Sequence, residues 1–281
     1  PDYSHRNAVG WEWADSSRAN RITEVLTSKE KFSQEELRKI QGDYLSLPAR
    51  HLVSYLKKTK SNTPETEKIK SQLLNWNFVM DKNSVEAGVY ASWEKVILDR
   101  AYKLFVPEKG KGVIKYVSLE RVMQWIETNQ RELKGRDTFL LSCLDEAIAN
   151  LHKKLGDDVA HWQYGQAAYH HVQIKHPLSN AVNDSIRAIL ETDILPRGGN
   201  GSTPGVTSNN DNQSHGATFK MVADVSDWDK TLFINSPGQS GNPASPFYKN
   251  LFEIWANDKH FTVYFSKEKV IQSAREKIIL M

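Results

Sequence analysis

The densest group of side chains that could bind a metal is a set of histidines, His170, His171 and His176. A metal site needs two or three such side chains that converge on one point. His170 and His171 are adjacent in a segment with period-two alternation, and adjacent residues of a strand point to opposite faces. His176 precedes a proline, where the chain turns. We therefore predict that these histidines pack and form hydrogen bonds rather than bind a metal.

A second group with the chemistry of a metal site is acidic and consists of Asp224, Asp227 and Asp229. Closely spaced carboxylates supply the hard oxygen ligands that calcium prefers. The surrounding sequence lacks the glycine and the distal bidentate glutamate of a helix-loop-helix calcium site. These residues are therefore predicted to be turn and strand-end carboxylates.

The patterns for a nucleophile and for a phosphate site are also incomplete. Ser240 is not framed by the Gly-x-Ser-x-Gly pattern of a hydrolase nucleophile elbow. Residues 200–203 and the glycines beside them lack the Gly-Lys-Ser/Thr ending of a phosphate-binding loop. Local patterns alone therefore indicate no self-contained catalytic site.

A helical region precedes most of these side chains. Ser33 and Glu36 form the Ser-x-x-Glu pattern of a capping box, in which each side chain satisfies a free backbone amide at a helix start. Apolar residues then recur at helical spacing as far as Leu52, which predicts a long amphipathic helix that starts near Ser33. Similar spacing continues to about residue 155. Residues 18–155 are therefore predicted to form a mainly helical lobe.

The segments that carry the histidines and the carboxylates have a different pattern. Apolar and polar residues alternate with period two in residues 169–174, 218–225 and 261–265. This alternation is typical of half-buried strands, so residues 156–281 are predicted to contribute strands to the fold. Residues 197–215 are rich in Gly, Ser and Asn, which predicts a long loop or a mobile hairpin.

The composition of the 281-residue chain excludes several classes of protein. Its 37 basic and 34 acidic residues are interleaved and give a net charge of +3, which argues against a general binder of nucleic acid. Cys143 is the only cysteine, so the chain forms neither an internal disulfide nor a multi-thiolate metal site. The sequence contains no apolar run of about 18 residues, and we expect no membrane partner.

The last third of the chain carries motifs of a known family. Residues 216–222, 227–229 and 235–241 read Gly-Ala-Thr-Phe-Lys-Met-Val, Asp-Trp-Asp and Asn-Ser-Pro-Gly-Gln-Ser-Gly. In this order they closely resemble the penicillin acylase family of N-terminal-nucleophile hydrolases. Similar segments occur upstream at residues 162–165, 176–178, 73–77, 41–43 and 18–22. The resemblance therefore spans almost the whole chain.

This resemblance implies an α+β protein that is part of an αββα sandwich, in which stacked sheets lie between helical layers and a large helical lobe is inserted. The chain would be the C-terminal part of the β subunit, and residues 1–17 would enter from a missing N-terminal part. Its partners would be the α chain and the N-terminal part of the β chain, produced from one precursor by autoproteolytic processing. The resemblance also implies a periplasmic or secreted location.

The implied reaction is hydrolysis of an N-acyl amide bond through an acyl-enzyme, with no cofactor for the chemistry. Self-cleavage would expose a serine that attacks the amide, and the α-amine of that serine, with a pKa of about 7.7–8.0, would serve as the base. Backbone amides and an Asn side chain would stabilise the oxyanion. The serine and this Asn would both lie outside the chain. The substrate would be a small N-acyl molecule such as a penicillin, an N-acyl homoserine lactone or an acyl peptide.

Two residues of this chain correspond by resemblance to functional positions. Arg21 would help to fix the oxyanion Asn or the substrate pocket, and the alternative is an ordinary salt bridge at a helix start. Asn7 falls near a carboxylate ligand of a structural calcium ion, and an amide oxygen can also ligate calcium.

Two other functions remain open on the sequence. One is an inactive scaffold or binding protein of the same fold, in which the partner segment does not begin with Ser, Thr or Cys. The other is a carbohydrate- or nucleic-acid-binding module that uses some of the 8 Trp as stacking platforms. Most of these Trp lie at helical apolar spacing or in the family motifs, which favours core packing.

Overall fold

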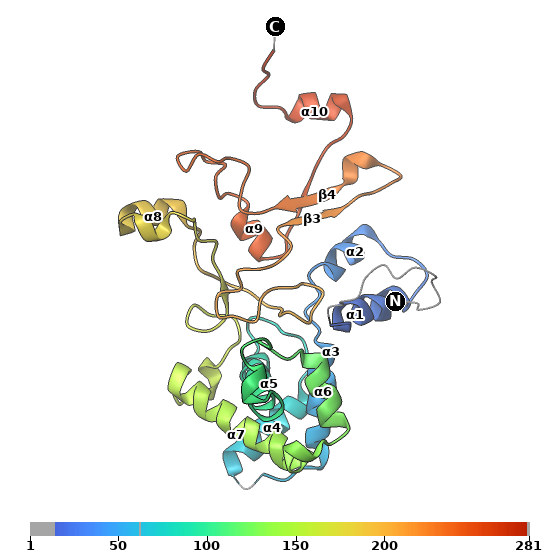
Figure 1. Ribbon diagram of the computed structural model, residues 1–281. Coiled ribbons are helices and arrows are strands. Elements are labelled where there is room, and N and C mark those ends of the chain that lie inside the picture. Colours follow the sequence, from blue (N-terminus) through green and yellow to red (C-terminus); the bar gives the residue numbers. More distant parts are fainter. Residues whose placement is uncertain (1–14, 62, 280–281) are drawn as a thin grey trace.

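The computed structural model describes residues 15–61 and 63–279. The helices between residues 47 and 155 gather at one end of the molecule, and a small strand region lies at the other end together with the helices after residue 180 (Figure 1). The helices of the first half are α1 (Ser17–Leu26), α2 (Gln34–Ile40), α3 (Leu47–Ser54), α4 (Pro64–Asn75), α5 (Val85–Phe105), α6 (Leu119–Glu127) and α7 (Arg136–Leu155). Every helix in the described ranges is too short or too polar to cross a membrane.

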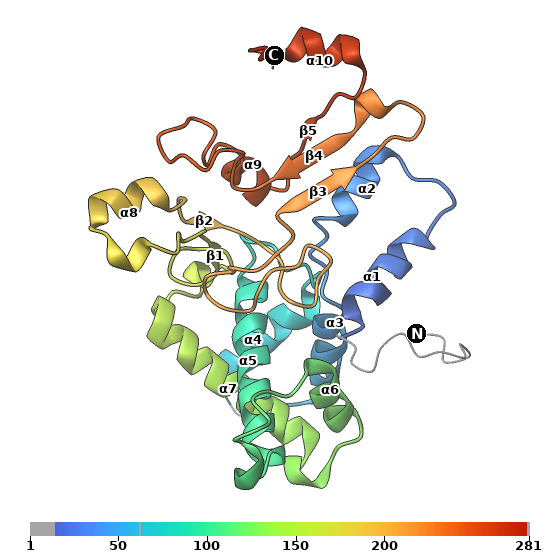
Figure 2. The same ribbon diagram turned by 45° about the horizontal axis from the view of Figure 1, so that its top comes forward.

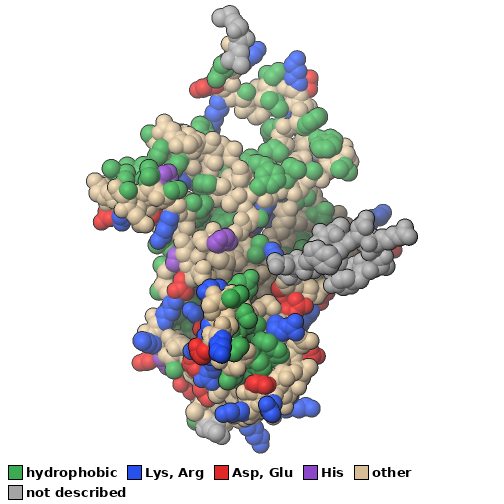
Figure 3. Space-filling view, in the orientation of Figure 1, with side chains coloured by type: hydrophobic (Ala, Val, Ile, Leu, Met, Phe, Trp, Pro, Cys, Tyr) green, Lys and Arg blue, Asp and Glu red, His purple; other side chains and the backbone are tan. Residues whose placement is uncertain are grey.

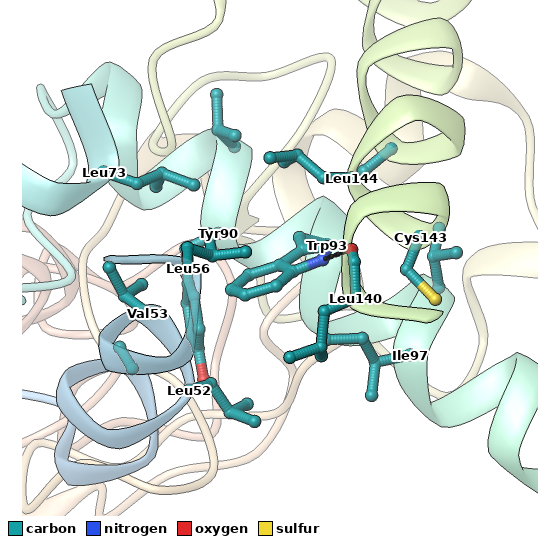
Figure 4. Close-up of a cluster of buried hydrophobic side chains, with 14 of the residues drawn as sticks. Leu52, Val53, Leu56, Leu73, Tyr90, Trp93, Ile97, Leu140, Cys143 and Leu144 are labelled. Atoms are coloured by element: carbon teal, nitrogen blue, oxygen red, sulfur yellow. Dashed lines mark hydrogen bonds between the residues drawn. The ribbon is translucent and has the colours of Figure 1, made fainter. Parts of the chain in front are cut away.

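The two longest helices, α5 and α7, pack against each other at the centre of the helical core. The α5 helix begins at Ser84, whose side chain accepts a hydrogen bond from the Ala87 N–H. Trp93 on α5 is fully buried, and its indole Nε1–H donates to the Leu140 carbonyl oxygen of α7 at 3.0 Å (Figure 4). Apolar side chains of α3 and α4 complete this core, and removal of their surface from water stabilises the helical part.

The prediction of one long helix from residue 33 onward is wrong, although the predicted start of the helix is confirmed. The Ser33 hydroxyl accepts from the Glu36 N–H at 3.3 Å, and the Glu36 carboxylate accepts from the Ser33 N–H at 2.9 Å. The helix then ends at Ile40, and a turn separates α2 from α3. Ser46 caps α3, and Pro48 stands in its first turn. Proline is tolerated there but would remove a hydrogen bond from the interior of one continuous helix.

The strand region contains two small antiparallel sheets (Figure 2). Strands β1 (His171–Val172) and β2 (Leu195–Pro196) form one sheet, and β3 (Phe219–Val222), β4 (Leu232–Asn235) and β5 (Phe261–Thr262) form the other in the order β3-β4-β5. Each of the three segments predicted from alternation contains one strand, namely β1, β3 or β5, and each of these strands is shorter than its predicted segment. The alternation predicts neither β2 nor β4. The later helices are α8 (Asp184–Leu190), α9 (Phe252–Ala256) and α10 (Lys267–Ser273).

One face of the three-stranded sheet is apolar and exposed within the described part of the chain. On β3, Phe219 is 55% exposed and Met221 is 46% exposed, whereas Lys220 between them is 6% exposed. Met221 lies opposite Phe233, and Phe233 lies opposite Phe261. Hydrophobic side chains are visible over this end of the molecule in Figure 3. We call this surface the outer apolar face; it consists of Phe219, Met221, Phe233 and Phe261.

The segment 197–215 is irregular, as predicted, but much of it is buried between the helices and the strands. The Tyr164 hydroxyl donates to the Gly199 carbonyl oxygen at 2.6 Å, and the Gln213 amide donates to the same oxygen at 3.2 Å. The Asn200 N–H donates to the Thr203 hydroxyl at 3.0 Å. The Gly199 N–H also donates to the Met80 carbonyl oxygen, and the Asp211 carbonyl oxygen accepts from the His171 N–H of β1, both at 2.8 Å. The segment therefore contacts both the helical part and the strand region.

The mixture of helices and strands agrees with the expected α+β class. The described residues contain one two-stranded and one three-stranded sheet, so the expected four-layered sandwich stays a prediction.

Candidate functional site

Arg21 on α1 uses its whole guanidinium group in ion pairs. Its Nε and Nη2 atoms donate to the Asp43 carboxylate at 2.8 and 2.7 Å, and Nη1 donates to Glu24 at 3.1 Å. Burial acts to lower the pKa of Arg21, but the hydrogen bonds from Asp43 and Glu24 outweigh it, and the pKa is raised. Arg21 is thus a fixed cation whose plane is set chiefly by Asp43.

Asp43 holds this position because it lies in the turn between α2 and α3. Its second carboxylate oxygen accepts from the Leu45 N–H at 2.8 Å, which is a local turn contact. Its backbone carbonyl oxygen accepts from the Gly205 N–H at 2.9 Å. The turn is therefore attached both to itself and to the segment 197–215.

A buried cluster of charges lies directly behind this turn. Asp258, just after α9, accepts from the Arg197 guanidinium at 2.9 Å and from the Lys220 ammonium at 2.7 Å. It also accepts a short hydrogen bond from the Tyr44 hydroxyl. The Arg197 guanidinium lies over the Trp255 ring, 4.1 Å from the ring centroid. The cluster therefore joins four segments that are far apart in the sequence.

A cavity of about 730 Å³ lies beside the Arg21 ion pairs. Arg50 connects the two, because it lines the cavity and donates to Glu24 at 3.0 and 3.2 Å. Polar lining side chains also come from α1, α3 and α6 and include Asn20, His51, Arg121 and Glu127. Groups of both charge signs can orient the polar part of a small molecule.

Comparison with models of protein families identifies the family of this chain. A family model described as penicillin amidase matches residues 1–272. The chain belongs to the penicillin amidase family.

Curated members of the penicillin amidase family extend this finding. The chain is 25% identical over 270 residues to penicillin acylase 2 proenzyme of Pseudomonas sp. (strain SE83), covering 92% of this chain and 34% of that protein. It is 19% identical over 315 residues to acyl-homoserine lactone acylase QuiP of Pseudomonas aeruginosa, covering 96% of this chain and 37% of that protein. The chain thus spans about a third of the length of these curated relatives.

A solved structure supports the fold. A thermostable penicillin G acylase from Alcaligenes faecalis superposes with a TM-score of 0.56 at 13% sequence identity. The superposition covers 100% of this chain and 55% of that chain. At this identity the likeness concerns the fold alone.

The structure places the clustered histidines His170, His171 and His176 of this penicillin amidase family chain in different surroundings. His170 is buried, and its Nδ1 atom lies 3.2 Å from the Asn210 carbonyl oxygen. His171 lies on β1, and the ring of His176 accepts a hydrogen bond from the Leu178 N–H at 3.1 Å. The contacts of His170 and His176 fit the predicted hydrogen-bonding roles, whereas the buried Nδ1 atom of His171 has no hydrogen-bond partner among the described residues.

The predicted turn and strand-end carboxylates are confirmed. Asp224 accepts from the Ser226 N–H at 2.9 Å, and Asp227 accepts from the Asp229 N–H at 3.2 Å. Asp229 itself accepts from the N–H groups of residues 265 and 266 at 2.7 and 2.8 Å. Ser240 accepts from the Asn242 N–H at 3.1 Å, which is a turn contact.

The calcium prediction lies outside the structure, because Asn7 is not among the described residues. Within residues 15–61 and 63–279, no group of three or more His, Cys, Asp and Glu side chains is arranged to hold a metal ion. A calcium ion at Asn7 therefore stays a prediction.

Glu94 is a buried carboxyl outside the Arg21 site. It lies on α5, is 4% exposed, and its Oε2 atom has no hydrogen-bond partner in the part of the chain that the structure describes. Burial raises the pKa of Glu94 to about 7. A second cavity, of about 800 Å³, is lined by Glu94 and by His170, and burial lowers the pKa of His170 to about 4. Both side chains therefore resist charging.

We expect the Glu94→Gln variant to be more stable than the wild type above about pH 7 and similarly stable near pH 5. Between the ordinary carboxyl pKa of 4.5 and the native pKa of about 7, the native state keeps a proton that the unfolded state has lost. The stability of the wild type therefore falls as pH rises through this window. The difference between variant and wild type should grow by about 1–3 kcal/mol from about pH 5 to pH 8 in urea unfolding.

The comparison between variant and wild type cancels the opposite contribution of His170, whose lowered pKa makes stability rise with pH. Glu253→Gln, at an exposed glutamate, is the matched control and should show no such pH dependence. A difference that stays flat with pH would mean that folding does not raise the pKa of Glu94.

Proposed function

We propose that this chain is the C-terminal segment of an acylase that hydrolyses an N-acyl amide bond. The attacking group would be an N-terminal serine outside the chain, and its α-amine would act as the base. Membership of the penicillin amidase family is the observation that supports this proposal. The reaction passes through an acyl-enzyme, which water then hydrolyses.

The proposed substrate is a small N-acyl molecule. Two relatives carry names that refer to penicillin and to acyl-homoserine lactones, which supports an acyl group joined through an amide to a compact polar ring. The cavity beside the Arg21 ion pairs is lined by charged side chains such as Arg121 and Glu127 and by apolar side chains such as Met123, so it suits a small molecule with both polar and apolar parts.

Arg21 is proposed to support the site rather than to react. Its guanidinium is held in one plane by Asp43 and Glu24, so this rigid ion-paired group can help to fix the oxyanion Asn or the substrate pocket. The helical lobe would then shape the access of the substrate.

The remaining segments of the same precursor, the α chain and the N-terminal part of the β chain, are the proposed partners. The outer apolar face supports this, because a sheet with one exposed aromatic face normally buries it against another layer. A second sheet packed about 10 Å away would cover that face and complete the αββα sandwich. The relatives are about three times as long as this chain, so a protein of their length has enough additional residues to form that layer.

The proposal is tested on the complete reading frame that contains this chain. Denaturing intact-mass analysis and N-terminal sequencing should find a processed chain that begins with Ser. The same sample should hydrolyse N-acyl homoserine lactones or chromogenic N-acyl anilides, and replacement of that serine by Ala should abolish the activity. A first residue other than Ser, Thr or Cys, together with no hydrolysis, would support the inactive-scaffold alternative.

The location proposed from the family resemblance is the periplasm or the medium. Fractionation of cells that express the complete reading frame, followed by immunodetection, checks it. Recovery of the processed protein with the cytoplasm would contradict this location.

A further inference from the structure

Asp258 has a backbone conformation that few residues adopt. It follows the C-terminus of α9 with φ of 54°, in the left-handed region where an L side chain is disfavoured. Asp is among the residues that tolerate this region, because its short side chain can bond locally. Here the carboxylate instead bonds to three segments that are remote in the sequence, so those contacts hold the residue in place.

Two of those contacts come from buried cations. Arg197 is 1% exposed and Lys220 is 6% exposed, and both donate to the same carboxylate oxygen of Asp258. A buried cation needs a nearby counter-charge, because its hydration is lost. Burial lowers the pKa of Lys220, while the charge of Asp258 acts in the opposite direction. Asp258 is therefore fixed between the segment after β2 and the inner face of β3.

The third contact connects Asp258 to the turn between α2 and α3. The Tyr44 hydroxyl donates to the other carboxylate oxygen, and burial raises the pKa of Tyr44, so the hydroxyl keeps its proton. The turn also approaches Asp258 closely at Gly42, where a Cβ would lie 3.1 Å from the Asp258 Cγ atom. The Tyr44 ring packs on Gly205, where a Cβ would lie 2.5 Å from a ring carbon. These close contacts fix the position of the turn relative to Asp258 and Gly205.

Asp43 lies in that turn, immediately before Tyr44, and its carboxylate sets the plane of Arg21. A short series of contacts therefore runs from Asp258 through Tyr44 and Asp43 to Arg21. We propose that Asp258 is a positioning residue for Arg21, acting through the Tyr44 hydroxyl. Its catalytic consequence rests on the proposed acylase function, whereas its structural consequence does not.

The first test measures the Arg21 guanidinium directly in the complete protein. Phenylglyoxal labels free guanidinium groups, and peptide mass spectrometry reports the labelling rate at Arg21. The Tyr44→Phe variant removes only the hydroxyl and keeps the ring, and Asp258→Asn keeps the side-chain size but removes the charge. Both variants should label Arg21 about 2- to 30-fold faster than the wild type, as a modest coupling between contacting groups allows.

Tyr248→Phe is the matched control. The Tyr248 hydroxyl donates to the Leu190 carbonyl oxygen at 3.0 Å, so the substitution also removes a hydrogen bond, but in the strand region away from Arg21. The control should leave the labelling rate at Arg21 unchanged. Equal labelling in wild type, Tyr44→Phe and Asp258→Asn would overturn the proposal, and so would an equally large effect of Tyr248→Phe.

The second test is kinetic and uses a chromogenic N-acyl anilide that the wild type hydrolyses. Tyr44→Phe and Asp258→Asn should lower kcat about 2- to 30-fold with a smaller change in KM. A purely structural loss would instead lower the amount of active enzyme, and the remaining active enzyme, measured by active-site titration, would keep the wild-type kcat and KM. If the wild type hydrolyses no amide, the proposed function fails and the labelling test still decides the role of Asp258. Faster labelling with unchanged kcat would overturn the catalytic part alone.

Discussion

Replacement of Arg21 by Lys in the complete protein is expected to lower the kcat/KM of the proposed amide hydrolysis by about 10²-fold, as misplacement of a supporting group by about 1 Å can do. Lysine keeps the positive charge but has one nitrogen instead of a planar fork. It cannot bond to Asp43 through two atoms and to Glu24 through a third, as Arg21 does. Steady-state kinetics on a chromogenic N-acyl anilide measure the change.

Stability separates this effect from unfolding. The Arg21 ion pairs are partly exposed, so the free energy of unfolding in urea should fall by only about 1 kcal/mol. Arg187→Lys is the control, because Arg187 also pairs with a helical carboxylate, Asp184, but lies on α8. It should leave kcat/KM unchanged. Full activity of Arg21→Lys would show that the Arg21 pairs are an ordinary salt bridge at a helix start.

Local side-chain chemistry made several elements predictable from the sequence. The capping box at Ser33 is confirmed because Ser and Glu at that spacing satisfy two amides without help from the rest of the fold. The carboxylates Asp224, Asp227 and Asp229 are confirmed as turn residues for the same reason, since each bonds to backbone N–H groups near a turn or strand end.

The break between α2 and α3 was not predictable from spacing, because apolar residues continue through it at helical intervals. Tyr44 falls on that spacing, yet its ring packs on glycines of the segment 197–215 and its hydroxyl bonds to Asp258. Contacts over more than 150 positions in the sequence therefore override the local helical preference. The same break places Asp43 opposite Arg21, so the missed turn is also the missed part of the site.

The buried charges were likewise missed. Lys220 lies between Phe219 and Met221, so the alternation alone assigns the apolar pair to the inside. The structure has the reverse arrangement, because Asp258 supplies a counter-charge on the inner side. In the sequence, the lysine stands out only because apolar residues surround it in a predicted strand, and this pattern does not show which acidic residue pairs with it. Burial of a charge depends on where the partner lies in space.

Trp93→Ala is expected to have the largest effect on stability, with a loss of about 3–5 kcal/mol in the free energy of unfolding. The indole is fully buried between α5 and α7, and no small side chain fills the space that its removal leaves. Its N–H also donates to the Leu140 carbonyl oxygen at 3.0 Å. Urea unfolding followed by circular dichroism measures the loss. Trp93→Phe keeps most of the ring volume and should lose less.

Trp228→Ala is the control for the loss of an indole, because Trp228 is 53% exposed and contacts Phe265 at 5.7 Å between ring centroids. Its replacement should change stability by no more than about 0.5–1 kcal/mol, as exposed positions do. A loss below about 1 kcal/mol for Trp93→Ala would mean that α5 and α7 do not pack through this side chain. A loss of the expected size would identify that helix pair as the support on which α3, and with it the Asp43 turn, is held.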